Sequence, residues 1–168
     1  IEFLPMARER KLDLRVVACS ASVRSDRRFV RRLLQNLISN ALKYTSSGRV
    51  LVGCRRRGNR LVVSVHDTGP GIPEDQRQAV FREFKRLAGA EKMARGLGLG
   101  LSIVERLARL LGTSIDIESA PGKGSAFSFE LPISVAAAAH ADAPQVARTA
   151  RRLMPLNVLC VDNEPKIL

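Results

Sequence analysis

Asn36, Asn40 and Lys43 fall on one stripe of a predicted helix, because each residue of a helix advances by about 100° around its axis. The stripe borders an apolar face, so these side chains can line a pocket. An amide oxygen suits a hard cation such as Mg²⁺, which takes few protein ligands and retains several waters. The Lys43 ammonium suits phosphate as a point charge. The alternative interpretation is that all three are ordinary residues at the boundary of a core.

Asp67 stands at the end of a predicted strand, directly before the turn Thr68-Gly69-Pro70-Gly71. The two glycines let the backbone of such a turn approach a ligand closely. A carboxylate held there can accept a hydrogen bond from the exocyclic amine of adenine, and a hydrogen bond to a charged group contributes about 1.5 to 3 kcal/mol. The alternative is a simple turn in which Asp67 bonds its own backbone, the commonest use of an Asp-x-Gly sequence.

Glycines alternate with leucines over residues 96–101, just before a second predicted helix. Alternating glycines leave backbone N–H groups accessible at a helix N-terminus, where phosphate is attracted, so the segment can hold a triphosphate. It is not a dinucleotide fingerprint, since no strand leads into it within a compact strand-helix-strand unit. The later sequence Gly122-Lys123-Gly124-Ser125 lacks the spacing of a phosphate-binding P-loop.

The composition of the chain allows one full domain plus fragments. Its 168 residues are 45% hydrophobic, and 28 Lys and Arg against 16 Asp and Glu give a net charge of +12, which attracts polyanions of any kind. With no Trp and one Tyr, the chain lacks the aromatic platform of single-strand nucleic-acid binders, although duplex binding stays open. Three widely spaced cysteines argue against a zinc site or a disulfide framework and favour a reducing compartment.

Hydrophobic periodicity predicts a helix-and-sheet sandwich. One helix begins at a cap, Ser25 or Asp26, and has apolar residues at helical spacing as far as Leu42; a second runs from about Gly100 to Leu111 and ends at Gly112. A long loop of the kind that carries function is expected between Asp67 and Gly100. The expected strands are Leu14–Ala18, Arg49–Arg55, Arg60–His66, Thr113–Ser119 and Ser125–Leu131, with turns at Gly58-Asn59 and Pro121–Gly124.

The order of these features is more informative than any one of them. The amide-bearing helix, the Asp-Thr-Gly-Pro-Gly turn, the phenylalanines Phe81 and Phe84, and the glycine-leucine helix start follow one another over about residues 12–132. This succession resembles the catalytic ATP-binding domain of sensor histidine kinases, in the wider group that includes gyrase, Hsp90 and MutL ATPases. The resemblance implies the Bergerat-type ATP-binding fold, an α/β two-layer sandwich with a mixed, mainly antiparallel sheet and helices packed on one face.

The resemblance also implies roles for individual residues. Asn40 would be the Mg²⁺ ligand, with Asn36 one turn earlier as a further catalytic residue, and Asp67 would bind the adenine amine. Residues from about Ile72 to Gly96 would form a lid, in which Arg86 assists phosphoryl transfer. The other residues implied in binding ATP are Lys43, Tyr44, Gly69, Gly71, Ile72, Gly96, Leu97, Gly98, Leu99, Gly100, Leu101 and Ser125.

The Asn36 position separates the kinases from the ATPases of the group. The resemblance implies that the ATPases carry a Glu there to activate water, whereas an amide cannot act as a general base near neutral pH, so fast hydrolysis is not expected. The phosphoryl acceptor of the family is a histidine on a helical hairpin upstream, and that histidine is missing here. His66 is expected to be a packed strand residue, and His140 lies in a linker.

We expect four segments along the chain. Residues 1–11 resemble the end of the segment that follows the dimerisation hairpin, 12–134 the catalytic domain, 135–155 a linker, and 156–168 the first strand of a truncated receiver domain. In that last segment Asp162 and Glu164 resemble the paired acidic residues of a receiver, and the alternative is an incidental acidic strand end. The parent protein would then be a hybrid kinase that passes phosphate from histidine to aspartate.

Taken together, the sequence predicts a cytoplasmic module that binds ATP and Mg²⁺ and donates the γ-phosphoryl to a histidine of the separate hairpin, with a receiver domain downstream. We expect no nucleic-acid partner, and a monomer, since the family dimerises through the missing hairpin. Two alternatives remain. An autonomous ATPase of the gyrase and Hsp90 type would release phosphate steadily, and a basic nucleic-acid-binding module would show salt-sensitive affinity.

Overall fold

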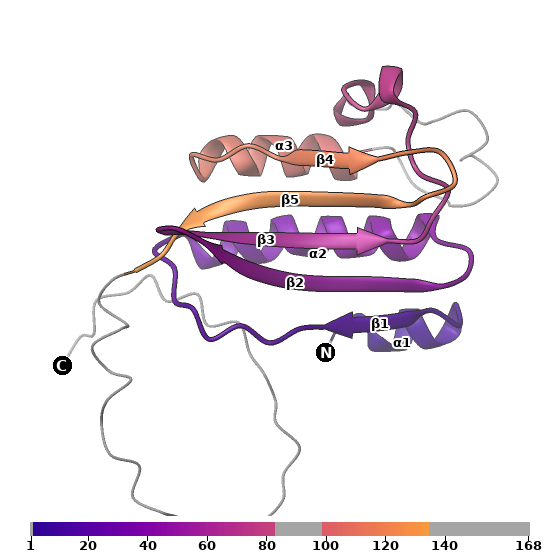
Figure 1. Ribbon diagram of the computed structural model, residues 1–168, viewed down its shortest axis with the longest axis horizontal. Coiled ribbons are helices and arrows are strands. Elements are labelled where there is room, and N and C mark those ends of the chain that lie inside the picture. Colours follow the sequence, from indigo (N-terminus) through magenta and orange to yellow (C-terminus); the bar gives the residue numbers. More distant parts are fainter. Residues whose placement is uncertain (1, 83–98, 135–168) are drawn as a thin grey trace, which may run out of the picture.

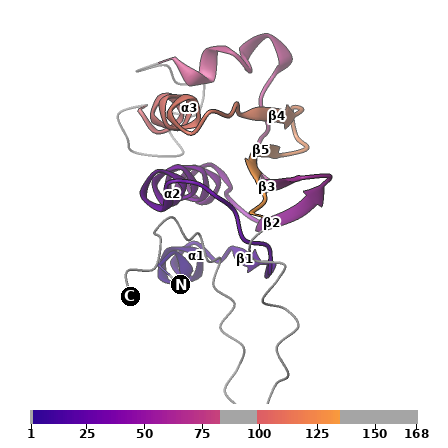
Figure 2. The same ribbon diagram turned by 90° about the vertical axis from the view of Figure 1, so that its left-hand side faces the viewer.

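A five-stranded sheet carries three α-helices on one of its faces in the computed structural model, which describes residues 2–82 and 99–134 (Figures 1 and 2). Within these two ranges, no helix has the length and hydropathy that crossing a bilayer requires. The elements in chain order are α1 (Leu4–Glu9), β1 (Asp13–Val16), α2 (Arg27–Tyr44), β2 (Arg49–Arg57), β3 (Arg60–Asp67), the 3-10 helices η1 (Glu74–Gln76) and η2 (Ala79–Phe81), α3 (Gly100–Leu110), β4 (Asp116–Ser119) and β5 (Ser125–Pro132).

The sheet has the strand order β1-β2-β3-β5-β4. Only β1 and β2 pair in parallel; the three other pairs are antiparallel, which confirms the expected mixed, mainly antiparallel sheet. The β2–β3 hairpin turns at Gly58 and Asn59 as predicted, but β2 runs to Arg57, two residues beyond the expected end, and Arg57 lies opposite Arg60. β5 lies beside β3, with Ser125 opposite Asp67, so the first residue of β5 lies next to the last residue of β3.

The core lies between the sheet and the helices. Alternate residues of each strand point toward the helices, and Val50, Val65 and Phe129 of three adjacent strands are completely or almost completely buried there. α2 meets them with the predicted apolar stripe, in which Leu33 and Leu42 have no exposed surface. This packing fixes the position and rotation of α2 against β3, and hence the direction of its polar edge.

Asp26 starts α2 as predicted. Its Oδ1 accepts hydrogen bonds from the backbone N–H groups of Arg28 (2.8 Å) and Phe29 (3.2 Å), which have no partner inside the helix. α2 ends at Tyr44, where Thr45 turns the chain into an extended conformation. The second helix also begins at the predicted residue, Gly100.

The structure adds one element that was not predicted and corrects the prediction for one segment. Residues near the N-terminus form a short helix, α1, and Ala7 of this helix is buried in the same core as α2, a contact that local patterning did not indicate. The expected loop after Asp67 is partly structured: η1 and η2 lie within it, and Ile72 and Val80 are buried. Those two apolar residues are anchored by the body of the domain, so residues 72–82 are not a simple surface loop.

His66 is also corrected. We expected a packed side chain, but strand alternation places it on the sheet face that carries no helix, where it is exposed and its Nε2 lies 3.0 Å from Ser64 Oγ. The expected strand at Thr113 begins only at Asp116, and β1 ends at Val16 rather than Ala18. In both cases the periodicity was right, but the partner strand is paired over fewer residues than the pattern covers.

Figure 2 shows the sheet face that carries no helix, and strand alternation places several arginines of β2 and β3 on that face. Arg57 and Arg60 lie on it and reach the carboxylate of Glu130 on β5, at 3.3 Å and 3.8 Å. Both arginines are largely exposed, so these ion pairs contribute little to stability. The excess positive charge of the described domain is therefore carried by solvated side chains rather than by the core.

Candidate active site

Asp67 ends β3 and its carboxylate faces the turn that follows. Oδ1 accepts a hydrogen bond from the backbone N–H of Gly69 at 2.8 Å, which is the bond that the simple-turn interpretation predicts. Burial raises the pKa of the Asp67 carboxyl, while hydrogen bonds from the backbone N–H groups of Gly69 and Ser125 and the charge of His66 lower it by less. A carboxylate has about four acceptor positions, so two backbone donors leave capacity for a ligand amine.

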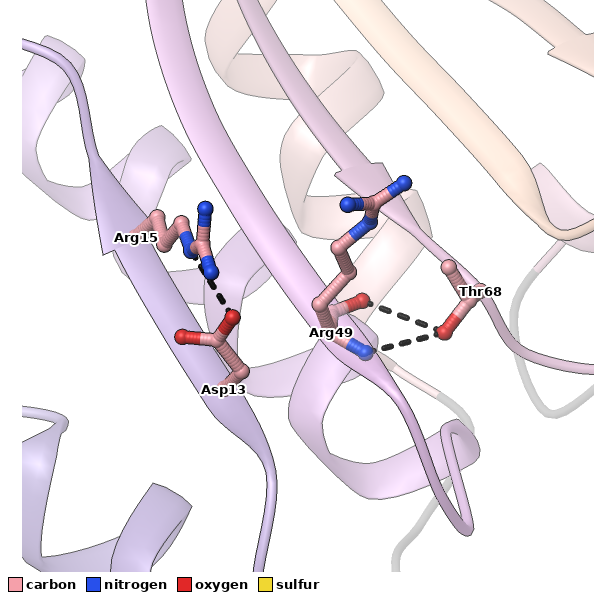
Figure 3. Close-up of polar contacts among 4 residues, drawn as sticks. All are labelled: Asp13, Arg15, Arg49 and Thr68. Atoms are coloured by element: carbon pink, nitrogen blue, oxygen red, sulfur yellow. Dashed lines mark hydrogen bonds and ion pairs between the residues drawn. The ribbon is translucent and has the colours of Figure 1, made fainter.

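Thr68 attaches the same turn to the start of β2 (Figure 3). Its Oγ1 accepts the backbone N–H of Arg49 at 3.0 Å, and its own N–H donates to Arg49 O at 3.2 Å. Gly48, with φ +106°, leaves room for this contact, since a Cβ there would lie 2.3 Å from Thr68 Oγ1. The nearby ion pair between Asp13 and Arg15 on β1 is exposed (Figure 3) and adds little rigidity.

A second set of contacts holds the far side of the turn. Gly71 has φ +73°, and a Cβ on it would lie 1.9 Å from Ala120 O. Gly124 packs against Asp67 just as closely, with a hypothetical Cβ 2.0 Å from Asp67 O. The buried Ser119 hydroxyl accepts the N–H of Ile72 at 2.8 Å and lies 2.9 Å from the Ser125 hydroxyl. Gly71 and Gly124 must therefore be glycine because a side chain would not fit there, and not only because of the backbone angle.

Asn40 of α2 lies against the first residue of α3. A Cβ on Gly100 would be 3.0 Å from the Asn40 amide oxygen and 3.1 Å from its amide nitrogen. The glycine therefore lets the N-terminus of α3 approach an amide side chain that is half-buried at the edge of α2. Since the first N–H groups of a helix have no partner inside it, this arrangement puts a polar side chain beside anion-binding donors.

These contacts form one continuous site. One turn after Asn40, the end of α2 reaches the Asp67 turn: a Cβ on Gly69 would lie 3.2 Å from Tyr44 O and 2.8 Å from Asp67 Oδ1. The amide of α2, the carboxylate of β3 and the N-terminus of α3 thus line the same edge of the domain. The predicted pieces do not lie on separate surfaces.

The remaining predicted residues differ in how directly the structure places them. Asn36 and Lys43 are half-exposed along α2 with Asn40, and Asn36 Nδ2 donates to Arg32 O of its own helix at 2.8 Å. Ile72 is buried in the core, and Leu101 packs partly against it. Leu99 is the half-exposed residue before α3. Arg86, Phe84, Gly96, Leu97 and Gly98 lie outside the described residues.

Two open cavities in the described ranges lie away from this site. One, of about 790 Å³, is lined by residues of η2 and α3, including Phe81 and Glu105. The other, of about 610 Å³, lies at the opposite end of the sheet, near Arg57 and Gly112. Neither includes Asn40 or Asp67.

The family model for "Histidine kinase-, DNA gyrase B-, and HSP90-like ATPase" matches residues 25–135, from the start of α2 to the end of the described domain. The chain belongs to this family. The match includes α2, the Asp67 turn, α3 and β5, which are the elements that form the site. Membership in the family implies ATP binding, and the fold, with three helices on one face of a mixed sheet, is that of the histidine kinase ATP-binding domain.

Relatives narrow the membership to two-component kinases. The chain is 37% identical over 135 residues to the adaptive-response sensory kinase SasA of Synechococcus sp. (strain CC9311), covering 79% of this chain and 35% of that protein. It is similar to full-length ShkA in complex with AMPPNP, with a TM-score of 0.66 at 31% identity, covering 79% of this chain and 28% of that one. The described domain is a catalytic ATP-binding domain of the sensor histidine kinase type.

The solved structure of an isolated catalytic domain is also similar to this chain. The catalytic domain of histidine kinase ThkA matches 78% of this chain and 86% of its own length, with a TM-score of 0.62 at 27% identity. By contrast, the chain spans about a third or less of the first curated relatives it matches.

Sequence reasoning missed several residues that support the site. Thr68, Ser119 and Gly124 were not assigned roles, yet they hold the turn after Asp67 to β2, β4 and β5. A signal was present for Gly124, which stands in a Gly-x-Gly sequence immediately before Ser125. The contacts of Ser119 join segments 47 residues apart, so no local pattern could reveal them.

Proposed function

We propose that this domain binds Mg-ATP between α2, the Asp67 turn and the start of α3, and donates the γ-phosphoryl to a histidine carried by a separate helical hairpin. The observation that supports this most strongly is the continuity of the site, in which Asn40 touches Gly100 while Asp67 and Tyr44 converge on Gly69. One end of the site has an acceptor for a purine amine. The other has N–H donors and an amide oxygen for a metal-bound triphosphate.

Asn40 is the residue we propose as the Mg²⁺ ligand. Its amide oxygen is a hard donor at the polar edge of α2, and within the described ranges no cluster of three or more His, Cys, Asp or Glu forms an all-protein metal cage. Mg²⁺ bound with ATP takes one or two protein ligands and keeps waters and phosphate oxygens, so this donor set fits it. The ion would neutralise charge on the phosphates.

We also propose roles for other residues of the site. Asp67 would select the purine by accepting a hydrogen bond from its exocyclic amine, and Gly69 and Gly71 would shape the pocket by allowing the turn after Asp67 to pack closely. Lys43, half-exposed on the same edge of α2, would face phosphate. We also propose that Arg86, outside the described residues, assists transfer.

The absence of a carboxylate at position 36 supports transfer over hydrolysis. The Asn36 amide is not a base, and its nitrogen is engaged by the backbone of its own helix. The bound triphosphate should therefore be kept for a better nucleophile than water.

Residues 156–168 support a further part of the proposal. Their apolar sequence, which ends in Asp162 and Glu164, resembles the start of a receiver domain and supports a hybrid kinase as the parent protein. We place the module in the cytoplasm, where ATP is available.

The test uses this chain and an added histidine-bearing hairpin from a two-component kinase. We expect ATP binding by calorimetry, slow phosphate release by the chain alone, and labelling of the hairpin histidine from γ-labelled ATP. Phosphate release at the same rate with and without the hairpin, and no labelled histidine, would identify an autonomous ATPase instead.

A further inference from the structure

Thr45, the first residue after α2, carries a buried hydroxyl that no hydrogen bond explains. The residue has no exposed surface, and its Oγ1 has no hydrogen-bond partner among the described residues. Its backbone N–H is satisfied by Ala41 O at 3.1 Å, so only the side chain is unpaired. Buried hydroxyls are nearly always paired, because removing one from water without a new partner costs free energy.

Packing alone does not account for the hydroxyl. Valine has nearly the same shape as threonine and would fill a fully buried, β-branched position without leaving a polar atom unpaired. An unpaired group of this kind in a folded protein calls for a functional explanation, such as a partner that arrives with a ligand.

The position of the hydroxyl indicates which partner. A Cβ on Gly69 would lie 3.3 Å from Thr45 Oγ1, 2.8 Å from Asp67 Oδ1 and 3.2 Å from Tyr44 O, so these three oxygens surround the same glycine. Among them the Thr45 hydroxyl has an unused hydrogen, and the carboxylate has unused acceptor positions. A modest movement of the Asp67 turn toward the end of α2 would bring donor and acceptor together.

We propose that Thr45 is a positioning residue of the purine pocket: its hydroxyl donates to the Asp67 carboxylate in the nucleotide-bound form and so orients that carboxylate toward the exocyclic amine. This rests on the proposed function, since it assumes that Asp67 holds the purine. The unpaired hydroxyl makes the empty pocket less favourable, and pairing it on binding adds to the affinity for a 6-aminopurine.

The test compares Thr45→Val and Thr45→Ser with the unchanged chain. Thr45→Val removes the unpaired hydroxyl, so we expect it to unfold at a higher urea concentration in the absence of nucleotide, yet to bind ATP about tenfold more weakly. Thr45→Ser keeps the hydroxyl and should bind ATP nearly as well as the unchanged chain. Thr113→Val, which removes a hydroxyl at the opposite end of the domain, serves as the control and should leave ATP affinity unchanged.

A second ligand tests whether Thr45 affects binding through Asp67. For the triphosphate of purine riboside, which lacks the exocyclic amine, Thr45→Val should have almost no effect on affinity. An equal loss of affinity for both nucleotides in Thr45→Val would overturn the proposal, and so would unchanged ATP affinity in that variant. Parallel losses of stability and ATP affinity in Thr45→Val and Thr45→Ser would also overturn it. In each of these cases ATP binding by the unchanged chain preserves the proposed function; if that chain fails to bind ATP, both proposals fall.

Discussion

Asp67 is the residue on which purine recognition depends. Changing it to Asn keeps the shape of the side chain but puts an amide in place of a charged acceptor. A hydrogen bond to a charged group contributes about 1.5 to 3 kcal/mol, so we expect Asp67→Asn to weaken ATP binding by about 10- to 150-fold, measured by calorimetry. Unchanged affinity in a folded variant would show that the purine is held elsewhere.

The same substitution has an effect on stability with a defined sign. Because burial raises the pKa of Asp67 above its ordinary value of about 3.8, the folded protein favours the neutral carboxyl. The unchanged chain should therefore gain stability relative to Asp67→Asn as the pH falls through the raised folded pKa, with the gain complete below about 3.8. Urea unfolding of both proteins at several pH values measures it. A difference that stays constant, or moves the other way, would show that the carboxyl is not destabilised by burial.

Asn40 should determine the metal dependence of binding. Replacing it with Ala removes the amide oxygen at the α2–α3 contact. We expect the gain in ATP affinity on adding Mg²⁺ to fall by about tenfold, equivalent to about 1.4 kcal/mol, in titrations with and without the ion. Asn59→Ala, in the exposed β2–β3 turn, removes an amide far from the site and should retain the full Mg²⁺ effect. The assignment fails if Asn40→Ala retains it too.

At the scale of elements, the site depends on turns that pack closely against neighbouring strands. Gly71 and Gly122 have almost the same backbone angle, with φ of +73° and +74°, but only at Gly71 is the position that a Cβ would take occupied by another backbone. An added Cβ meets Ala120 O at 1.9 Å on Gly71 and nothing within 4 Å on Gly122. The pair therefore separates the cost of the backbone angle from the cost of crowding.

Gly122→Ala should cost about 1 to 2 kcal/mol of unfolding free energy, the general penalty for a left-handed residue, and leave ATP affinity unchanged. Gly71→Ala should cost about 3 kcal/mol or more and also weaken ATP binding, because the turn after Asp67 must move. Urea denaturation and calorimetry on both variants measure these effects. Equal losses of stability would mean that the turn accommodates the extra atom without moving.

At the scale of the whole molecule, a net charge of +12 could attract ATP without any specific site. A specific site predicts more: ligand that binds only the folded state stabilises it by about 2.7 kcal/mol at a hundred times the dissociation constant, a rise of roughly 10 °C in melting temperature for a domain of this size. We expect Mg-ATP to give such a rise at physiological salt. Tripolyphosphate at the same concentration should give much less, and an equal rise with both would indicate attraction by charge alone.

The net positive charge also underlies the alternative function, a basic nucleic-acid-binding module. The arginines near Glu130 are exposed and lie on the open face of the sheet, on the side opposite the helices. If the charge served nucleic acid, affinity for duplex DNA would be substantial and would fall steeply with salt, whereas Mg-ATP would not protect the fold.

The sequence by itself determined most of the elements, but not α1, η1 or η2. Hydrophobic periodicity and local turn signals located α2, with its cap at Ser25 or Asp26, the β2–β3 hairpin and the start of α3, because these depend on interactions within a few residues of chain. Residue types, motif spacing and the family resemblance identified Asp67, Asn40 and Gly100 as candidate ligand residues. Their roles in binding ATP remain predictions; the structure shows that Asn40 lies against Gly100 and that the end of α2 reaches the turn after Asp67.

Only the tertiary structure decided which of these residues meet. The burial of Ala7 and Ile72, the exposure of His66 and the support of the Asp67 turn by Ser119 depend on which strands become neighbours and which sheet face is covered. The unpaired hydroxyl of Thr45 became visible in the same way, since burial and the lack of a partner are properties of packing. Contacts between distant segments arise from the close-packed core as a whole, and no short stretch of sequence contains them.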